Sequence, residues 1–256
     1  VRQDILDYIT ISTAGNATDF GNLTQARYAP AACSDGTYGV CAGGNLSSAV
    51  NTIDYFTIST AGNATDFGNL TNSRFSLGAT SDSTRGIFAG GNGSLNTIDY
   101  ITIVTPSNAT DFGDLTQARD FPSGLSNGTR GCFGGGESSG TQVNTIDYIT
   151  IATTSNATDF GNLTVIRRAT GAASNGTRGV WAGGHNNSSL HDVIDYVTIS
   201  TAGNATDFGD LTLARWTLSG TSDGSRGVFA GGDNVTYRDT IDYITIATTS
   251  NATDFG

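Results

Sequence analysis

Short runs that mix apolar and polar residues recur along the whole chain, and each run is bounded by turn-forming residues. The run at 145–152 reads TIDYITIA and carries its apolar side chains at Ile146, Tyr148, Ile149 and Ile151. This alternation is only partial, as expected for a strand that packs on both faces. The Ser-Asn and Ala-Gly-Asn turns that follow such runs tolerate positive φ. The pattern therefore predicts short antiparallel strands and almost no helix.

The runs belong to a repeat. The segment TDFG begins at Thr18, Thr65, Thr110, Thr158, Thr206 and Thr253, with spacings of 47, 45, 48, 48 and 47 residues. Periods of 40 to 50 residues that contain short strands are typical of β-propellers. Four strand segments fit between the turns of each unit. We expect an all-β fold in which every unit is a four-stranded antiparallel blade.

The repeat predicts one propeller domain over residues 1–256. The units span approximately 25–71, 72–116, 117–164, 165–212 and 213–256, and a half-blade hairpin, 1–24, precedes them. Five inner strands favour five blades; a six-bladed ring, the alternative, would lack one inner pair. Either residues 1–24 or residues 240–256 can complete the last blade. The other segment is then free to join a neighbouring molecule or a sixth blade.

Within a unit, we expect the inner strand to begin after Arg27 and the second strand to end at the glycine doublet 43–44. The third strand carries Tyr55, and the outer strand carries Phe67. The connections from second to third strand and from outer strand to the next inner strand then lie at the same end of each blade.

Charge narrows the list of partners. All twelve basic residues are Arg, against 23 acidic residues, and the net charge is −11. A nucleic-acid backbone or an anionic membrane surface requires clustered positive charge, so both are excluded as expected partners. No apolar run approaches the roughly 18 residues that span a bilayer, so membrane insertion is not expected.

Charged residues that every copy keeps are expected to pair, because a buried unpaired charge is costly. The IDY column is Asp7, Asp54, Asp99, Asp147, Asp195 and Asp242, and the TDFG column is Asp19, Asp66, Asp111, Asp159, Asp207 and Asp254. Two Arg columns match them: Arg27, Arg74, Arg119, Arg167 and Arg215, and Arg85, Arg130, Arg178 and Arg226. Calcium binding by the Asp residues is the alternative.

Nothing in the sequence indicates catalysis. An active site needs an asymmetric set of groups rather than the same carboxylate in each blade. The only histidines, His185 and His191, share one loop, and neither a catalytic triad nor a phosphate loop is present. We expect a non-enzymatic protein with no catalytic residue, no metal site and no cofactor, calcium being the one exception considered.

Two residue types have an ordinary structural explanation. Cys33, Cys41 and Cys132 form no metal-spaced pair. Cys33 and Cys41 fit opposite positions of one hairpin, but free buried thiols are favoured because Cys41 and Cys132 occupy apolar columns. Asn-X-Ser/Thr sequons recur in every unit, and turn geometry is favoured for them over glycosylation.

Two segments differ between copies and share one predicted face. The residues near the first Arg column are Tyr28, Phe75, Phe121, Arg168 and Trp216, and the loops after the glycine doublets begin at Asn45, Asn92, Glu137, His185 and Asp233. Recognition residues are usually placed on loops of a rigid scaffold. Aromatic rings among polar loops suit stacking on sugars or gripping a protein loop. Alternatively, the rings plug the channel or pack between blades.

The order of these features resembles the Kelch repeat: a glycine doublet, a variable loop, a Tyr-bearing strand, an aromatic one strand later, and an Arg that opens the next unit. The resemblance covers the whole chain. It departs from the family at the outer-strand aromatic, where Kelch repeats usually have Trp and this chain has Phe20, Phe67, Phe112, Phe160, Phe208 and Phe255. The phrase IDYITIATTSNATDFG is also similar to repeats in tail-fibre and other virion proteins of marine bacteriophages.

These resemblances imply a binding propeller on a virion tail fibre or another extracellular appendage, with a host surface glycan or protein as its partner. The alternative is a structural, filament or spacer subunit that self-associates through its spare terminal hairpin. A secreted glycoprotein is a further possibility.

Overall fold

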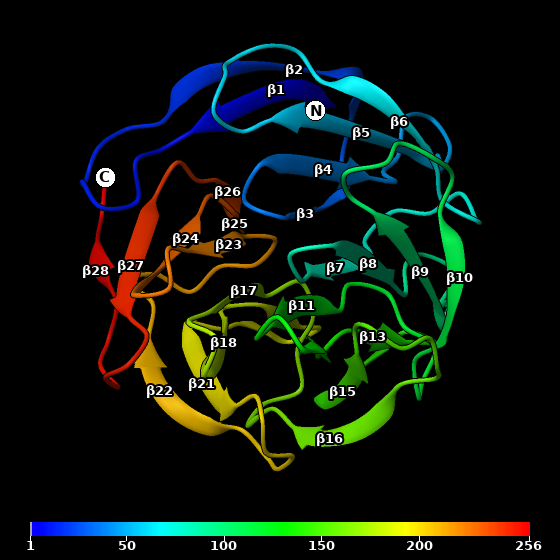
Figure 1. The fold of residues 1–256 in the computed structure, drawn as a ribbon. Helices are drawn as coiled ribbons and strands as arrows, with labels where there is room; N and C mark the ends of the chain where they lie inside the picture. Colours follow the sequence, from blue (N-terminus) through cyan, green and yellow to red (C-terminus); the bar gives the residue numbers. More distant parts are fainter. Residues whose placement is uncertain (1) are drawn as a thin grey trace.

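The computed structural model describes residues 2–256, and strands but no helices occur among them. Five four-stranded antiparallel sheets are arranged around a common axis as the blades of a β-propeller (Figure 1). The predicted all-β fold and the predicted number of complete blades are therefore confirmed. The part of the chain that is described contains no helix long and apolar enough to cross a membrane.

Every blade runs from an inner to an outer strand in chain order. Blade one contains β3 (Ala31–Ser34), β4 (Tyr38–Ala42), β5 (Thr52–Thr57) and β6 (Thr65–Asn69). Blade two contains β7 (Gly78–Ser81), β8 (Arg85–Ala89), β9 (Thr97–Thr102) and β10 (Thr110–Asp114). Blade three contains β11 (Ser123–Ser126), β12 (Arg130–Gly134), β15 (Thr145–Thr150) and β16 (Thr158–Asn162).

The last two blades follow the same order. Blade four contains β17 (Gly171–Ser174), β18 (Arg178–Ala182), β21 (Val193–Thr198) and β22 (Thr206–Asp210). Blade five contains β23 (Ser219–Ser222), β24 (Arg226–Ala230), β27 (Ile241–Thr245) and β28 (Thr253–Asp254). The C-terminal segment therefore completes the last blade.

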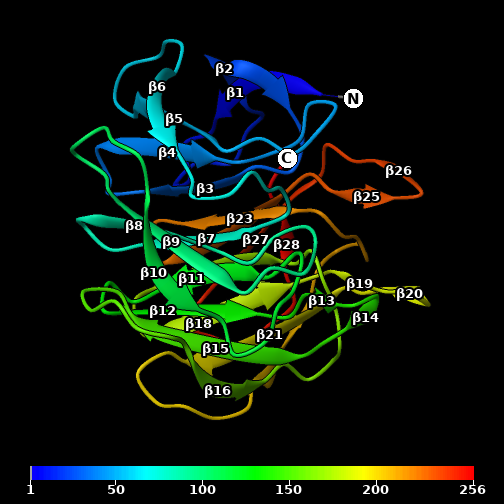
Figure 2. The same ribbon diagram turned by 90° about the vertical axis from the view of Figure 1, so that its right-hand side faces the viewer.

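Small two-stranded ribbons, which the sequence did not predict, occupy three of the loops between second and third strands. They are β13 (Glu137–Ser138) with β14 (Thr141–Gln142), β19 (His185–Asn186) with β20 (Ser189–Leu190), and β25 (Asp233–Asn234) with β26 (Thr236–Tyr237). In the side view the ribbons project from one end of the ring (Figure 2).

The N-terminal hairpin of β1 (Gln3–Tyr8) and β2 (Thr18–Arg27) lies between blade five and blade one (Figure 1). The amide of Ala64 in blade one donates to the carbonyl of Asn22 at 2.8 Å, as the amide of Ala109 donates to the carbonyl of Asn69 between blades one and two. On the other flank, Ile9 and Ile11 pack against the apolar core of blade five. The hairpin is thus the outer half of a sixth position.

The apolar core lies between neighbouring blades. One cluster joins Ile53 and Phe67 of blade one to Phe88, Ile101 and Ile103 of blade two, and similar clusters fill the following seams. Within each blade, the Tyr of the third strand meets the Phe of the outer strand edge to face, a favoured aromatic arrangement. The Phe that replaces the Kelch Trp is therefore a core residue.

Buried ion pairs fix the first Arg column to the IDY column. Arg167 and Asp195 are 2.9 Å apart, and neither side chain is exposed. The hydroxyl of Thr164 donates to the other Asp195 oxygen at 2.5 Å, and Arg167 also donates to the carbonyl of Trp181. Burial lowers the pKa of Arg167, and the carboxylate of Asp195 opposes that effect. The equivalent pairs are Arg27–Asp54, Arg74–Asp99, Arg119–Asp147 and Arg215–Asp242.

The pairing predicted for the second Arg column is wrong. Arg130 lies over the ring of Tyr148, with the guanidinium carbon 4.4 Å from the ring centre, and donates to the carbonyl of Ile199 in the next blade. Asp159 of the TDFG column is exposed and forms no ion pair with residues 2–256. The side chains of the two columns do not meet because the Arg is on the second strand, whereas the Asp is two strands away on the outer strand.

The cysteines and sequon asparagines behave as expected from their columns. All three cysteines are free thiols, and Cys41 and Cys132 are buried. Burial raises the pKa of Cys132 to about 12. Asn204 accepts a hydrogen bond from the Asn162 amide of the preceding blade at 3.0 Å, and the same bond recurs at the equivalent seams. These contacts support a turn and seam role for the asparagines; occupancy by glycans stays a prediction.

Candidate functional site: the variable loop face

The two variable segments of each unit meet on one face, as the strand order predicted. The residue after the first Arg column exchanges backbone hydrogen bonds with the first loop residue after the glycine doublet, as Arg168 and His185 do at 3.1 Å in both directions. Tyr28 with Asn45, Asp120 with Glu137, and Trp216 with Asp233 do the same, whereas the Asn92 amide donates to the Phe75 carbonyl and the Phe75 amide donates to the Asn92 side chain. Nine of the ten predicted site residues therefore enter these contacts, and the tenth, Phe121, directly follows Asp120.

A backbone collar supports this face. In each blade, the residue that directly follows the one bonded to the loop adopts a positive φ of 53° to 57°, although none of the five is glycine: Ala29, Ser76, Phe121, Ala169 and Thr217. The amides of the last four donate to the carbonyl of the counterpart in the preceding blade, so the series crosses four successive seams from Ala29 to Thr217. Left-handed backbone costs a non-glycine residue about 1–2 kcal/mol. These inter-blade hydrogen bonds hold the collar in that conformation and fix the side chains above it.

Arg168 is the centre of the largest side-chain cluster on the face. It forms an ion pair with Glu137 of the neighbouring blade. Its guanidinium carbon lies 5.2 Å from the ring centre of Phe121 and 5.6 Å from that of Trp216. Arg168 thus bridges three blades, and its charge is held between two aromatic rings and one carboxylate, an arrangement that limits its motion.

His185 extends the cluster. Its ring centre is 5.3 Å from that of Trp216, with an interplanar angle of 41°. Partial burial lowers the pKa of His185, and the charge of Arg168 lowers it further, while Glu137 opposes the shift. The imidazole is therefore neutral at neutral pH and offers one donor and one acceptor.

Amides complete the polar side of the cluster. The side-chain nitrogen of Gln142 donates to Glu137 at 2.8 Å and to the side-chain oxygen of Asn187 at 2.9 Å. Burial raises the pKa of the nearby Asp120 carboxyl. Sequence comparison of the copies missed Gln142 and Asn187, because loop length varies and the pattern does not show which loop side chains turn back toward the next blade.

A second, smaller group lies on blades one and two. The rings of Tyr28 and Phe75 meet edge to face at 5.7 Å, and Tyr28 is 44% exposed. Asn92 accepts a hydrogen bond from the Phe75 amide at 3.0 Å. Asn45 and Asp233 are placed by their backbone bridges. The two aromatic residues therefore pack partly on one another.

Two cavities, of about 420 and 370 Å³, lie away from this face, one beside the N-terminal hairpin and one beside the turn at 198–204. Among residues 2–256, no group of three or more His, Cys, Asp or Glu side chains is placed to hold a metal ion.

The fold defines the class of this protein, a β-propeller with five complete blades. No protein-family model matches the sequence, and no curated protein matches it significantly. The Kelch and phage-fibre resemblances accordingly stay predictions from the repeat motif.

Proposed function

We propose that this protein is a non-catalytic binding propeller of a phage tail fibre or similar extracellular appendage, and that its variable loop face recognises a host surface glycan or protein. The observation that carries the proposal is the cluster around Arg168. Five blades of near-identical sequence differ where their loops meet, and the differences gather aromatic, cationic, anionic and amide groups on one surface.

The chemistry of the cluster favours a saccharide. The apolar face of a sugar ring stacks on an aromatic side chain, and Trp216 and Tyr28 retain exposed surface for such contact. Sugar hydroxyls are recognised by planar groups with fixed donors and acceptors, which Arg168, Glu137 and Gln142 supply. Because these groups already hold one another, little side-chain entropy is lost when a ligand binds.

Binding to a glycan array and to host cells tests the proposal. Trp216→Ala combined with Tyr28→Ala should weaken binding at least about tenfold, because aromatic anchors dominate such interfaces. Val104→Ala is the matched control: Val104 is 60% exposed but lies in a turn at the opposite end of the blades. Binding that survives the double substitution, or that Val104→Ala weakens equally, would remove the site from the loop face.

The structural alternative, a spacer or filament subunit, is favoured by one observation. The edge of β1 that faces away from β2 is unpaired among residues 2–256, and Ile5 and Tyr8 of this strand are 53% and 48% exposed. Mass measurement in solution separates the two functions. A linking role predicts a mass that grows with protein concentration, whereas a strict monomer with an ordered hairpin would eliminate that role.

A further inference from the structure

The sixth position of the ring is an outer half-blade whose inner half is missing among the described residues. An apolar side chain of blade one is exposed beside it. Ile58 of blade one is 40% exposed, whereas Ile103, Ile151, Ile199 and Ile246, in the same column, are at most 1% exposed. In the other seams, the second strand of the preceding blade covers this column.

The buried ion pair is also incomplete there. Asp7 occupies the IDY column in β1, but it is exposed and forms no ion pair or side-chain hydrogen bond with residues 2–256. Its counterparts in all five complete blades each have an Arg partner at 2.9 to 3.0 Å and a Thr hydroxyl. Tyr8 keeps its edge contact with Phe20 but lacks the Arg that covers Tyr148 and Tyr196.

Two hydrogen-bond ladders stop at the same place. The collar runs from Ala29 to Thr217 and has no link between those two residues. At the opposite end of the inner strands, the Ser81 hydroxyl donates to the carbonyl of Ser34 at 2.6 Å, and this bond repeats through Ser126, Ser174 and Ser222. At one end of this ladder the Ser34 hydroxyl remains as a donor, and at the other end the Ser222 carbonyl remains as an acceptor.

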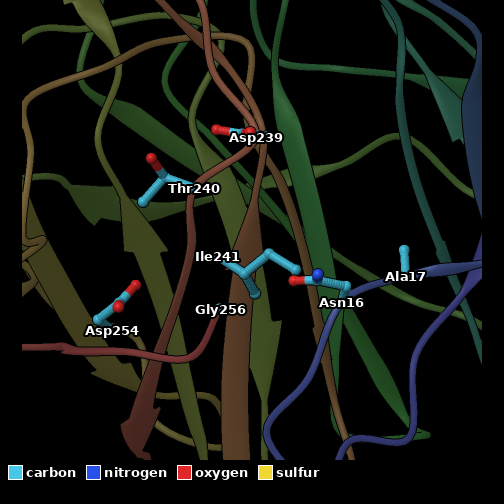
Figure 3. Close-up of a pocket in the computed structure, with 7 residues that line it drawn as sticks. All are labelled: Asn16, Ala17, Asp239, Thr240, Ile241, Asp254 and Gly256. Atoms are coloured by element: carbon cyan, nitrogen blue, oxygen red, sulfur yellow. The ribbon is translucent and has the colours of Figure 1, made fainter.

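The outer entrance to the position is a cavity of about 420 Å³ (Figure 3). Asn16 and Ala17 of the hairpin line one side, and Asp254 and Gly256 of blade five line another. In five seams the side-chain oxygen of the equivalent Asn accepts the amide that follows the TDFG glycine. At Asn16 that acceptor is adjacent to Gly256.

We propose that the sixth position is an acceptor for a two-stranded β segment with the inner-half sequence of this same repeat. The segment brings an LTxxR motif, whose Thr and Arg bind Asp7, and a TRGVWAGG-type strand, which pairs with β1 and covers Ile58. Each of these contacts is present in the complete blades of the same molecule. An intact second copy does not meet them, because its five inner pairs are all held within complete blades.

The test appends a copy of residues 162–184 after Gly256, the place that this segment takes after Gly161. The extended chain should have a higher thermal midpoint, and the amide of Asp7 should exchange at least about tenfold more slowly. The decisive measurement is whether the effect of Asp7→Asn on the thermal midpoint depends on the added segment. Asp7→Asn should leave the midpoint of the parent chain unchanged and lower that of the extended chain.

Two controls isolate the proposed contact. The same extension carrying Met in place of its Arg167 copy should abolish the effect of Asp7→Asn. The segment supplied as a separate peptide should bind the parent chain and should bind Asp7→Asn more weakly. Two extended chains could also exchange their added segments, which would double the mass. If Asp7→Asn still lowers the midpoint of that dimer, the result also supports the acceptor. An unchanged midpoint, an unprotected β1 and an Asp7→Asn effect that is the same with and without the segment would overturn it.

Discussion

Blade four and the N-terminal hairpin share the third- and outer-strand motif, but their central Asp residues have opposite environments. Asp195 is completely buried and bound by Arg167 and Thr164. Asp7 is exposed and has neither partner among residues 2–256. The hairpin still forms and still packs Tyr8 on Phe20 at 6.2 Å. Local sequence is thus sufficient for the hairpin, whereas burial and charge compensation come from the inner half of a blade.

The largest expected effect comes from making the same substitution in both regions. Asp195→Asn leaves the Arg167 charge buried without its carboxylate, which should cost about 3–5 kcal/mol of the free energy of unfolding. Asp7→Asn should change stability by no more than about 0.5 kcal/mol. Urea denaturation measures both. Equal losses would mean that Asp7 is already paired.

Glycine substitutions test whether the hairpin is packed as a blade. A Cβ at Gly68 would lie 2.5 Å from the Ser107 carbonyl oxygen, and one at Gly21 would lie 2.3 Å from that of Gly62. Both glycines also have positive φ, 143° and 151°. Gly68→Ala and Gly21→Ala should each cost about 2–3 kcal/mol, the latter by releasing the hairpin.

Gly62→Ala is the control for this pair, because a Cβ there meets nothing within 4 Å. Its unfolding free energy should match that of the parent chain. If Gly21→Ala is equally harmless, the hairpin does not occupy the seam. Chemical denaturation combined with limited proteolysis of residues 1–24 reads both effects.

The smallest expected difference concerns the second Arg column. Arg178 lies 4.6 Å over Tyr196 and donates to the Ala247 carbonyl at 2.9 Å, whereas Arg226 lies 4.9 Å over Tyr243 and reaches Ser12 only at 3.5 Å. Arg178→Gln should cost about 1–2 kcal/mol and Arg226→Gln less than about 1 kcal/mol. The difference in denaturation midpoint measures how well blade five and the hairpin are joined. A reversed order would contradict this account of the seam.

The repeat made much of the fold predictable. Spacing and turn residues predicted the blades, and the matched Arg and Asp columns predicted that buried ion pairs form. The columns did not reveal which Asp meets which Arg, because side-chain reach across strands depends on register. Ribbons such as β13–β14 were missed because two-residue strands leave no periodicity.

The candidate site was predictable only in part. Variation between copies located the loop face, and strand order placed both variable segments on it. The contacts of Gln142 and Asn187 were not predictable, since they join loops of different blades whose separation the sequence does not encode. The place of the hairpin also required the structure, because its motif fits the last blade and a sixth position equally well.

Residue-resolved amide hydrogen exchange tests the central claim, that the sixth position is only an outer half-blade. The Gly183 amide donates to the Val193 carbonyl, so the amide of Asp195, two residues further on, faces the second strand of blade four, and its equivalent in β1 is Asp7. The account predicts slow exchange at Asp195, and exchange at least about a hundredfold faster at Asp7. Equal protection of the two amides would contradict it.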